Sequence, residues 1–198
     1  IVFLSVWNLL KARRNPEYKL CLENASLVLP ISKSIIRGAA FLKRTKPVRY
    51  NPFSAIISFF TILETRYKSL YLLGGHKNTL IESERNLKAT FPGLHIVGRY
   101  TGYFPKDMEK DVLSAIFKAN PSMVLLADGI PSGVTWSYAR RNSFGSSIFV
   151  YYKDALSIFS KRKKRIPNET FDAGREIWAE IAGNPLKIFL VFPYIWYI

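Results

Sequence analysis

Short apolar runs alternate along this chain with longer segments in which apolar residues recur at helical spacing. A short run bounded by turn residues predicts a buried strand, and helical spacing predicts a helix that buries one face. The predicted strands are Val2–Val6, Leu27–Leu29, Ser69–Leu73, Leu94–Val97, Met123–Ala127 and Ile148–Tyr151. The predicted helices are Glu17–Glu23, Ser32–Leu42, Pro52–Glu64, a segment capped by Thr79 and Glu82 that ends at Thr90, a segment that begins near Pro105, Pro131–Arg141 and Glu169–Ala182.

Strands that alternate with helices of this length predict βαβ units, and therefore an α/β fold with a parallel sheet flanked by helices. We expect three neighbouring parallel strands, at Tyr71–Leu73, Leu94–Val97 and Val124–Ala127. Such sheets bind ligands at the carboxyl ends of their strands. The turns predicted at that edge are Gly74-Gly75, Gly98–Gly102 and Asp128-Gly129.

The balance of charge narrows the choice of partner. The chain carries 29 Lys and Arg against 14 Asp and Glu, for a net charge of +15. This surplus predicts a polyanionic partner: nucleic acid, anionic lipid headgroups, or a nucleotide-sugar with a lipid diphosphate. Nucleic acid is disfavoured, because no binding motif is present and the basic residues are spread over several loops. One cysteine, Cys21, excludes an internal disulfide, and two histidines without a Cys/His cluster argue against structural zinc.

The segment Phe91–Pro105, FPGLHIVGRYTGYFP, joins a predicted strand to a glycine-rich turn and the start of a helix. Free backbone N–H groups and the helix dipole converge at such junctions, which therefore suit phosphate-bearing ligands. The chain has neither a GxGxxG fingerprint nor a P-loop, so the pattern alone favours simple tight turns at these glycines. Tyr103 and Phe104 either stack on a base or pack in the core.

Asp128 is the sharpest polar candidate, because it ends a buried strand at the ligand edge of the predicted sheet. Its carboxylate there could bind a ribose or act as a base. The alternative, which we favour from the pattern alone, is that Asp128 caps the helix at Pro131. His76 follows the glycine pair and either contacts a phosphate or is simply exposed, whereas His95 lies inside a strand and is expected to be structural.

Several segments resemble, in order and spacing, the WecB/TagA/CpsF family of bacterial glycosyltransferases, glycosyltransferase family 26. They are NPEYKLCLENASLVLP at Asn15–Pro30, YLLGG at Tyr71–Gly75, FPGLHIVGRYTGYF, Gly129-x-Pro131 with Trp136, and Arg165-x-Pro167. The resemblance implies a Rossmann-like domain, here residues 1–160, followed by a C-terminal appendage, here residues 161–198. It also implies transfer of a sugar from UDP to a polyprenol-diphosphate-linked acceptor at the cytoplasmic face of the cell membrane, without a cofactor.

The chain departs from the family where the family places its polar chemistry. Ile31-Ser32 stands where the family has Asp-Gly, whose Asp is its candidate general base, and Phe3 and Ser5 align with its Thr-x-Asn. Gly133-Val134 replaces its Gln-Glu. Isoleucine cannot accept a proton, and serine is a poor base near neutral pH. We therefore expect weak or absent transfer, and the alternative is a catalytically inactive nucleotide- or membrane-binding module of the same fold.

The resemblance and the strand ends together define the candidate site. Asp128 is the catalytic candidate, with Asp154 a distant second, and no metal is implied because the chain has no Asp-x-Asp. The expected substrate-binding residues are Gly75, Gly98, Arg99, Gly102, Tyr103, Gly129, Pro131 and Arg165. The expected partners are a UDP-sugar donor, a lipid-linked acceptor and an anionic membrane surface, and homo-oligomerisation stays open.

Two segments near the C-terminus predict the membrane contact. Lys161–Arg165, KRKKR, is either a solvated loop or a source of cations for a diphosphate or for anionic lipid. The apolar tail Ile188–Ile198 is too short to span a bilayer, which takes about 20 apolar residues, but it could anchor in one. Together they predict peripheral attachment to anionic bilayers.

Overall fold

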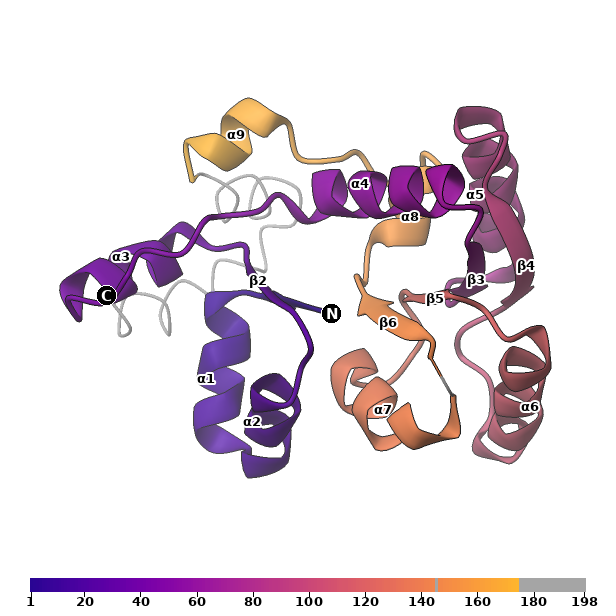
Figure 1. Cartoon of the computed structure of the whole chain (residues 1–198), viewed down its shortest axis with the longest axis horizontal. Coiled ribbons are helices and arrows are strands. Elements are labelled where there is room, and N and C mark those ends of the chain that lie inside the picture. The colour runs from indigo at the N-terminus through magenta and orange to yellow at the C-terminus, as the bar shows by residue number, and fades with distance from the viewer. Residues whose placement is uncertain (145, 175–198) are drawn as a thin grey trace.

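A computed structural model describes residues 1–144 and 146–174. Within these ranges the fold is α/β, with an all-parallel six-stranded sheet in the order β2-β1-β6-β5-β3-β4 (Figure 1). The strands are β1 (Val2–Leu4), β2 (Val28–Pro30), β3 (Ser69–Leu73), β4 (His95–Tyr100), β5 (Met123–Leu126) and β6 (Ile148–Tyr151). The predicted fold class is confirmed.

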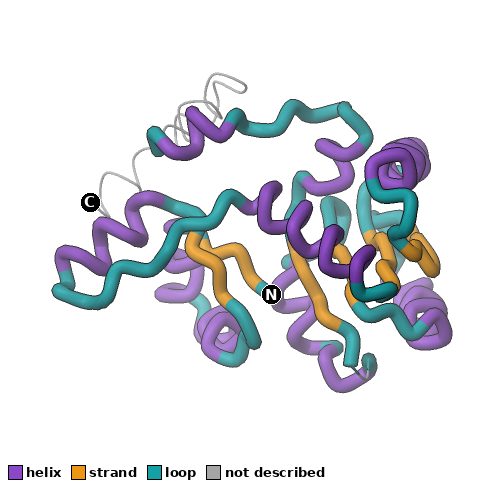
Figure 2. Tube along the Cα trace, turned by 45° about the horizontal axis from the view of Figure 1, so that its top comes forward, coloured by secondary structure: helices purple, strands orange, loops and turns teal. Residues whose placement is uncertain are grey.

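Helices cover both faces of this sheet (Figure 2). They are α1 (Val6–Arg14), α2 (Pro16–Glu23), α3 (Lys33–Phe41), α4 (Pro52–Thr65), α5 (Lys77–Thr90), α6 (Glu109–Ala119), α7 (Gly133–Ala139), α8 (Ala155–Phe159) and α9 (Asn168–Asp172). Two single 3₁₀ turns, η1 (Lys106–Met108) and η2 (Arg141–Ser143), precede α6 and follow α7. In Figure 1, α4, α5 and α8 lie above the sheet, and α1, α2, α6 and α7 lie below it.

Strand β3 shows how the sequence builds the two layers. Successive side chains of a strand point to opposite faces. Accordingly Leu70 and Leu72 pack with α4, α5 and α8, whereas Tyr71 and Leu73 pack with α6 and α7. Both faces of β3 are covered, which explains why it reads as an unbroken apolar run rather than an alternating one. Its neighbours are β4 and β5, both parallel, so the predicted trio of strands is confirmed.

Several boundaries predicted from the sequence are wrong, including the end of Leu94–Val97, which continues to Tyr100 as β4. The first strand ends at Leu4, and Ser5 caps a helix, α1, that the pattern did not reveal. This helix escapes detection because Val6 is its only buried residue, so it has no apolar stripe. The helix expected to be capped by Thr79 and Glu82 begins earlier, at Lys77, and Thr79 is buried inside its first turn. The segment expected as a helix from Pro131 starts at Gly133, after a turn.

The expected helix Glu169–Ala182 is described only in part. Its described portion is α9, Asn168–Asp172, and the remainder, with the tail Ile188–Ile198, lies outside the described residues. No described helix is both long and apolar enough to cross a membrane.

Side chains of α5 hold α8 against the sheet. The buried Ser83 hydroxyl lies 2.7 Å from the Thr79 carbonyl and 2.6 Å from the Leu156 carbonyl, and its single proton is shared between them. One turn later, the Asn86 side chain donates to the Phe159 carbonyl at 2.8 Å. These bonds fix the segment that follows β6, and so they fix the carboxyl end of that strand.

We predict that Ser83→Ala lowers the free energy of unfolding by about 1 kcal/mol, because it removes a buried bond between two helices. The Leu156 carbonyl keeps the Ser160 N–H as a donor, which limits the loss. Ser58→Ala is the matched control, since Ser58 makes the same bond to the carbonyl four residues earlier but on an exposed face. Urea denaturation measures both variants, and equal destabilisation would contradict the bridging role.

Candidate functional site

The turns that follow β3, β4 and β5 are joined through their backbones. The Gly75 N–H donates to the Asp128 carbonyl at 2.6 Å, and the Gly102 N–H donates to the Gly75 carbonyl at 2.9 Å. The Tyr103 N–H donates to the Gly129 carbonyl at 2.9 Å. The three turns therefore form one connected surface at the carboxyl edge of the sheet, and the sequence was right to bring these segments together.

Glycine is required where these turns touch. A Cβ on Gly102 would lie 2.6 Å from the Asp128 carbonyl oxygen, closer than real side chains approach backbone. Gly129 has φ of +87°, a left-handed conformation that other residues adopt at a cost, and a Cβ there would lie 2.6 Å from the Tyr103 ring. Gly102 and Gly129 therefore allow the backbones of adjacent turns to approach each other closely. The N–H groups of Gly75, Gly102 and Tyr103, which were expected near a phosphate, are bonded to carbonyls.

Side chains, in contrast, face solvent at this surface. The Tyr103 hydroxyl donates to Asp128 Oδ2 at 2.5 Å, and Lys153 Nζ lies 3.8 Å from Asp128 Oδ1. The Tyr103 ring stacks on the His76 ring, with centroids 4.6 Å apart and planes within 9°. Tyr103 is 54 % exposed and itself left-handed, at φ of +58°. We refer to His76, Tyr103, Asp128 and Lys153 as the edge cluster.

The bond between Tyr103 and Asp128 changes the acidity of the phenol. The hydrogen bond to Asp128 raises the pKa of Tyr103 above its usual value of 10.0, with smaller contributions from desolvation and from the Asp128 charge. All of these effects favour the protonated phenol. Tyr103 therefore holds a proton against the carboxylate throughout the neutral range, and the pair forms a hydrogen-bonded acid and acceptor at the surface.

The preferred interpretation of Asp128 as a helix cap is wrong. Helix α7 begins at Gly133, and the side chain of its N-cap residue, Ser132, makes no capping hydrogen bond. Pro131 lies in the turn between, and the Asp128 carboxylate points to Tyr103 and Lys153 instead. Lys153 was missed because its position, just after β6, carries no motif. Its contact with Asp128 follows from the neighbouring places of β5 and β6 in the sheet.

Other expected site residues lie elsewhere. Gly98 sits inside β4, opposite Tyr71, and gives room to the Tyr71 ring. Arg99 forms an ion pair with Glu84 on α5. The guanidinium carbon of Arg165 lies 6.0 Å from the centroid of the Phe53 ring at the start of α4. Of the expected binding residues, the structure therefore brings Gly75, Gly102, Tyr103, Gly129 and Pro131 to the same edge.

Phe104 turns away from Tyr103. It packs against the core beneath the sheet, with its ring edge-on to Tyr100 at 6.1 Å. The two aromatic residues thus divide the alternatives left by the sequence: Phe104 packs in the core, and Tyr103 is available to a ligand. Among the described residues, no three His, Cys, Asp or Glu side chains converge as a metal site would require.

The ends of β1 and β2 form the other half of this edge. Ser5 and Asn8 bond to each other, and Ser32 Oγ accepts from the Val6 N–H at 3.3 Å. The Ile31 carbonyl accepts from Arg49 Nε at 2.9 Å. The sequence has no Asp or Glu between Glu23 and Glu64, so this stretch supplies hydroxyls and amides but no carboxylate.

Asp128 lies at a different part of the edge from Ile31. Strand β2 lies three places from β5 in the sheet. At about 4.8 Å per strand, the two carboxyl ends are roughly 14 Å apart. The edge cluster and the Ile31 position are therefore separate parts of the edge, with the end of β6 between them.

Helix α9 lies against the part of the sheet edge that contains Ile31. Arg49 Nη1 donates to the Phe171 carbonyl at 2.5 Å, and its guanidinium carbon lies 3.7 Å from the Phe171 ring centroid. Lys33 Nζ donates to the Ala173 carbonyl at 3.3 Å, and Asn51 bonds Asn168 at 3.2 Å. Arg49 thus links the Ile31 backbone to α9, a role that no sequence motif indicated.

This arrangement is that of a doubly wound α/β protein. Helix α5 follows β3 above the sheet, whereas α7 follows the adjacent β5 below it. In doubly wound α/β proteins, ligands bind beside strands whose connections diverge in this way. The edge cluster sits at that position.

Comparison with known proteins identifies the family. The sequence model of the glycosyl transferase WecG/TagA/CpsF family matches residues 1–196, and the chain belongs to this family. It is 25% identical over 177 residues to the N-acetylglucosaminyldiphosphoundecaprenol N-acetyl-beta-D-mannosaminyltransferase of Bacillus spizizenii, which covers 89% of this chain and 68% of that protein. It is 20% identical over 176 residues to the Bacillus subtilis protein of the same name, with the same coverage.

We predict that the Tyr103 phenol titrates with a midpoint above pH 10. Its Cζ resonance is identified as the one that disappears in Tyr103→Phe. Asp128→Asn should lower this midpoint, because it removes the main cause of the raised pKa. The raised pKa also means that folding favours the protonated phenol. Its contribution to stability is present below pH 10, the unfolded value, and is lost as pH rises through the folded pKa. Carbon-13 NMR of labelled tyrosine measures the midpoint, and a value unchanged by Asp128→Asn would contradict the hydrogen bond.

Proposed function

We propose that this chain binds a UDP-sugar and a polyprenol-diphosphate-linked acceptor at the carboxyl edge of its sheet, and that it transfers the sugar slowly or not at all. The match of the family over residues 1–196 carries the proposal. The names of the two Bacillus relatives support an N-acetylhexosamine as the sugar and an undecaprenol-diphosphate-linked saccharide as the acceptor. The connected turns after β3, β4 and β5 support the location.

The edge cluster supplies the groups that a nucleotide needs. The exposed Tyr103 ring, stacked on His76, offers an aromatic surface for uracil. Asp128 is placed to accept hydrogen bonds from ribose hydroxyls, and Lys153 is placed to meet diphosphate charge. Because the backbone N–H groups of Gly75, Gly102 and Tyr103 are occupied, side chains and not a backbone cradle stabilise the leaving UDP in this proposal.

Transfer itself needs a proton acceptor. The acceptor hydroxyl oxygen forms a bond to the anomeric carbon, the bond from that carbon to the UDP phosphate oxygen breaks, and the hydroxyl proton passes to a base. A positioned base contributes about 10² to 10⁴ in rate. Among the described residues, Ser32, Ser5 and Asn8 supply side-chain oxygens near the Ile31 position, and none of them is basic near neutral pH.

A second function, a non-catalytic binding module, rests on the same observation. Ile31 packs against the core in place of a carboxylate, whereas the edge cluster keeps groups that bind. Binding without turnover would assign the chain to this function. The two functions differ in one measurement, the release of UDP from a UDP-sugar in the presence of a lipid-linked acceptor.

We predict that UDP stabilises the chain, by roughly 2.7 kcal/mol at 100 times its dissociation constant. Tyr103→Asn should weaken this effect, because asparagine tolerates the left-handed backbone but removes the ring. Tyr67→Asn is the matched control, since Tyr67 is also exposed and left-handed, at φ of +51°, and follows α4. Thermal shift with UDP, UDP-N-acetylhexosamines and other nucleotides measures the effect, and equal shifts in both variants would place the nucleotide elsewhere.

We predict that Ile31→Asp combined with Ser32→Gly raises sugar transfer by about 10² to 10⁴. The new carboxylate would lie beside Arg49, whose charge favours its ionised form. Ile57→Asp is the control, because Ile57 is also partly buried against the same core cluster but lies on α4. UDP release with a lipid-linked acceptor measures turnover. Robust wild-type turnover that Asp128→Asn leaves unaffected would show that a different residue acts as the base.

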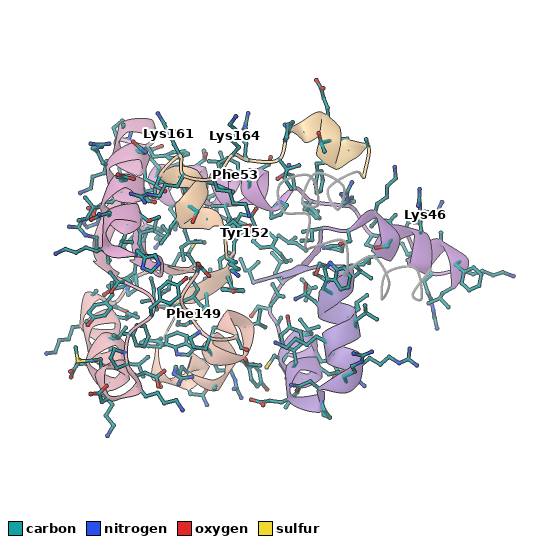
Figure 3. The ribbon with its side chains drawn as sticks, turned by 180° about the vertical axis from the view of Figure 1, so that it is seen from behind. Lys46, Phe53, Phe149, Tyr152, Lys161 and Lys164 are labelled. Carbon is teal, nitrogen blue, oxygen red and sulfur yellow. The ribbon has the colours of Figure 1, made fainter. Side chains whose placement is uncertain are left out.

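Peripheral attachment to an anionic membrane through Lys161–Arg165 remains part of this proposal, but the structure limits that segment. Arg162 pairs with Glu82 at 3.1 Å, and Lys163 pairs with Asp154 at 2.5 Å. Lys161 and Lys164, labelled in Figure 3, are exposed. Two of the five basic residues are thus matched by acids of the chain, which weakens the segment as a lipid-binding patch.

A further inference from the structure

The longest stretch of sequence without an acid lies at the other end of the molecule. Between Glu23 and Glu64 the chain has basic residues but no acid. Those residues are Lys33, Arg37, Lys43, Arg44, Lys46 and Arg49. This stretch includes α3 and the connection to α4, which form one end of the long axis in Figure 1, and Figure 3 labels Lys46 beside α3.

Two large apolar side chains project from the far end of α3. Phe41, the last residue of α3, is 87 % exposed, and Leu42 is 67 % exposed. Adjacent exposed apolar groups of this kind mark contact sites. Lys43, Arg44 and Lys46 follow them in sequence and are also exposed. We call these five residues the α3 tip.

The backbone gives the α3 tip a defined shape. The Leu42 N–H donates to the Gly38 carbonyl at 3.0 Å, and the Arg44 N–H donates to the Ala39 carbonyl at 2.9 Å. Lys43 adopts the left-handed conformation, at φ of +52°, that ends helices in this way. Phe41 and Leu42 are therefore presented by a closed helix end and not by an unsupported loop.

We propose that the α3 tip docks on the surface of an anionic bilayer, with Phe41 and Leu42 entering the interface and Lys43, Arg44 and Lys46 contacting lipid phosphates. Apolar burial and attraction to anionic lipid act together in such binding, and each alone is weak. Charge complementarity selects this partner, because the α3 tip itself contains no acid and so repels a second copy of itself. Duplex nucleic acid, the other polyanion, offers no apolar interior for Phe41 and Leu42 to enter. The inference deepens the membrane attachment proposed above and stands whether or not the chain transfers sugar.

Vesicle co-sedimentation of the full chain tests the proposal, with phosphatidylcholine vesicles that contain or lack phosphatidylglycerol. Phe41→Ser with Leu42→Ser should lower binding to the anionic vesicles by about tenfold or more. The control is Phe117→Ser, since Phe117 is 65 % exposed in the last turn of α6, next to Lys118. Changing Lys43, Arg44 and Lys46 to Gln should also lower binding and reduce its salt dependence. Lys161→Gln with Lys164→Gln should have the smaller effect.

A fluorophore that reports polarity, attached at Leu42→Cys, provides a direct readout, because the native Cys21 is buried. Its emission should shift to the blue when anionic vesicles are added, and a label at Phe117→Cys should not shift. A shift already present without vesicles would mean that the chain or a second copy covers the tip, and would overturn the proposal. So would unchanged vesicle binding by the Phe41/Leu42 variant, or loss of duplex DNA binding by the charge variant with vesicle binding intact. UDP binding and turnover, measured in parallel, keep the outcome separate from that of the transferase proposal.

Discussion

The carboxyl edge of this sheet depends on how closely three turns approach one another. Backbone meets backbone at Gly75, Gly102 and Asp128-Gly129, with donor–acceptor distances of 2.6 to 2.9 Å. That approach is possible only where a Cβ is absent, and a single methyl group on Gly102 would strike the Asp128 carbonyl. Once the backbones are joined, the side chains of the same turns are directed to solvent. The same constraint therefore both occupies the N–H groups of Gly75, Gly102 and Tyr103 and exposes the edge cluster.

Burial explains which elements the sequence could predict. Ser69–Leu73 and Ile148–Tyr151 were predicted to the residue, because both are short apolar runs whose ends are marked by turns. Helix α1 was missed since it buries little, so its start depends on a Ser5–Asn8 capping box that resembles any polar stretch. The bounds of an element that packs on both sides can be predicted from its apolar composition. The start of an element that buries little on one side depends instead on local hydrogen bonds.

The site was predictable as a place but not as a set of contacts. The strand ends and glycines located the turns, yet Gly98 and Arg99 were expected in the turn after β4 and lie inside that strand. A register shift between Leu70 and Tyr71 accompanies the continuation of β4 to Tyr100, which draws both residues into the strand. Asp128 was predicted to cap a helix because Pro131 suggested a helix start. Ser132 adopts a left-handed conformation instead, and the helix begins only at Gly133. Pairings such as Asp128–Lys153 depend on strand order, which no local pattern contains.

The distribution of charge separates two roles that a net charge of +15 cannot distinguish. The run Lys161–Arg165 is the densest basic segment in sequence, yet folding brings Glu82 and Asp154 to two of its members. An ion pair between exposed side chains adds little stability, but it cancels the field that would attract a distant anion. The stretch between Glu23 and Glu64 is less dense but has no acid of its own, and Phe41 and Leu42 are exposed at the same end of the molecule. Attraction and apolar contact thus coincide at the α3 tip. The edge cluster, with Asp128 between a phenol and an ammonium, is nearly balanced in charge and suited to a small ligand rather than to a surface.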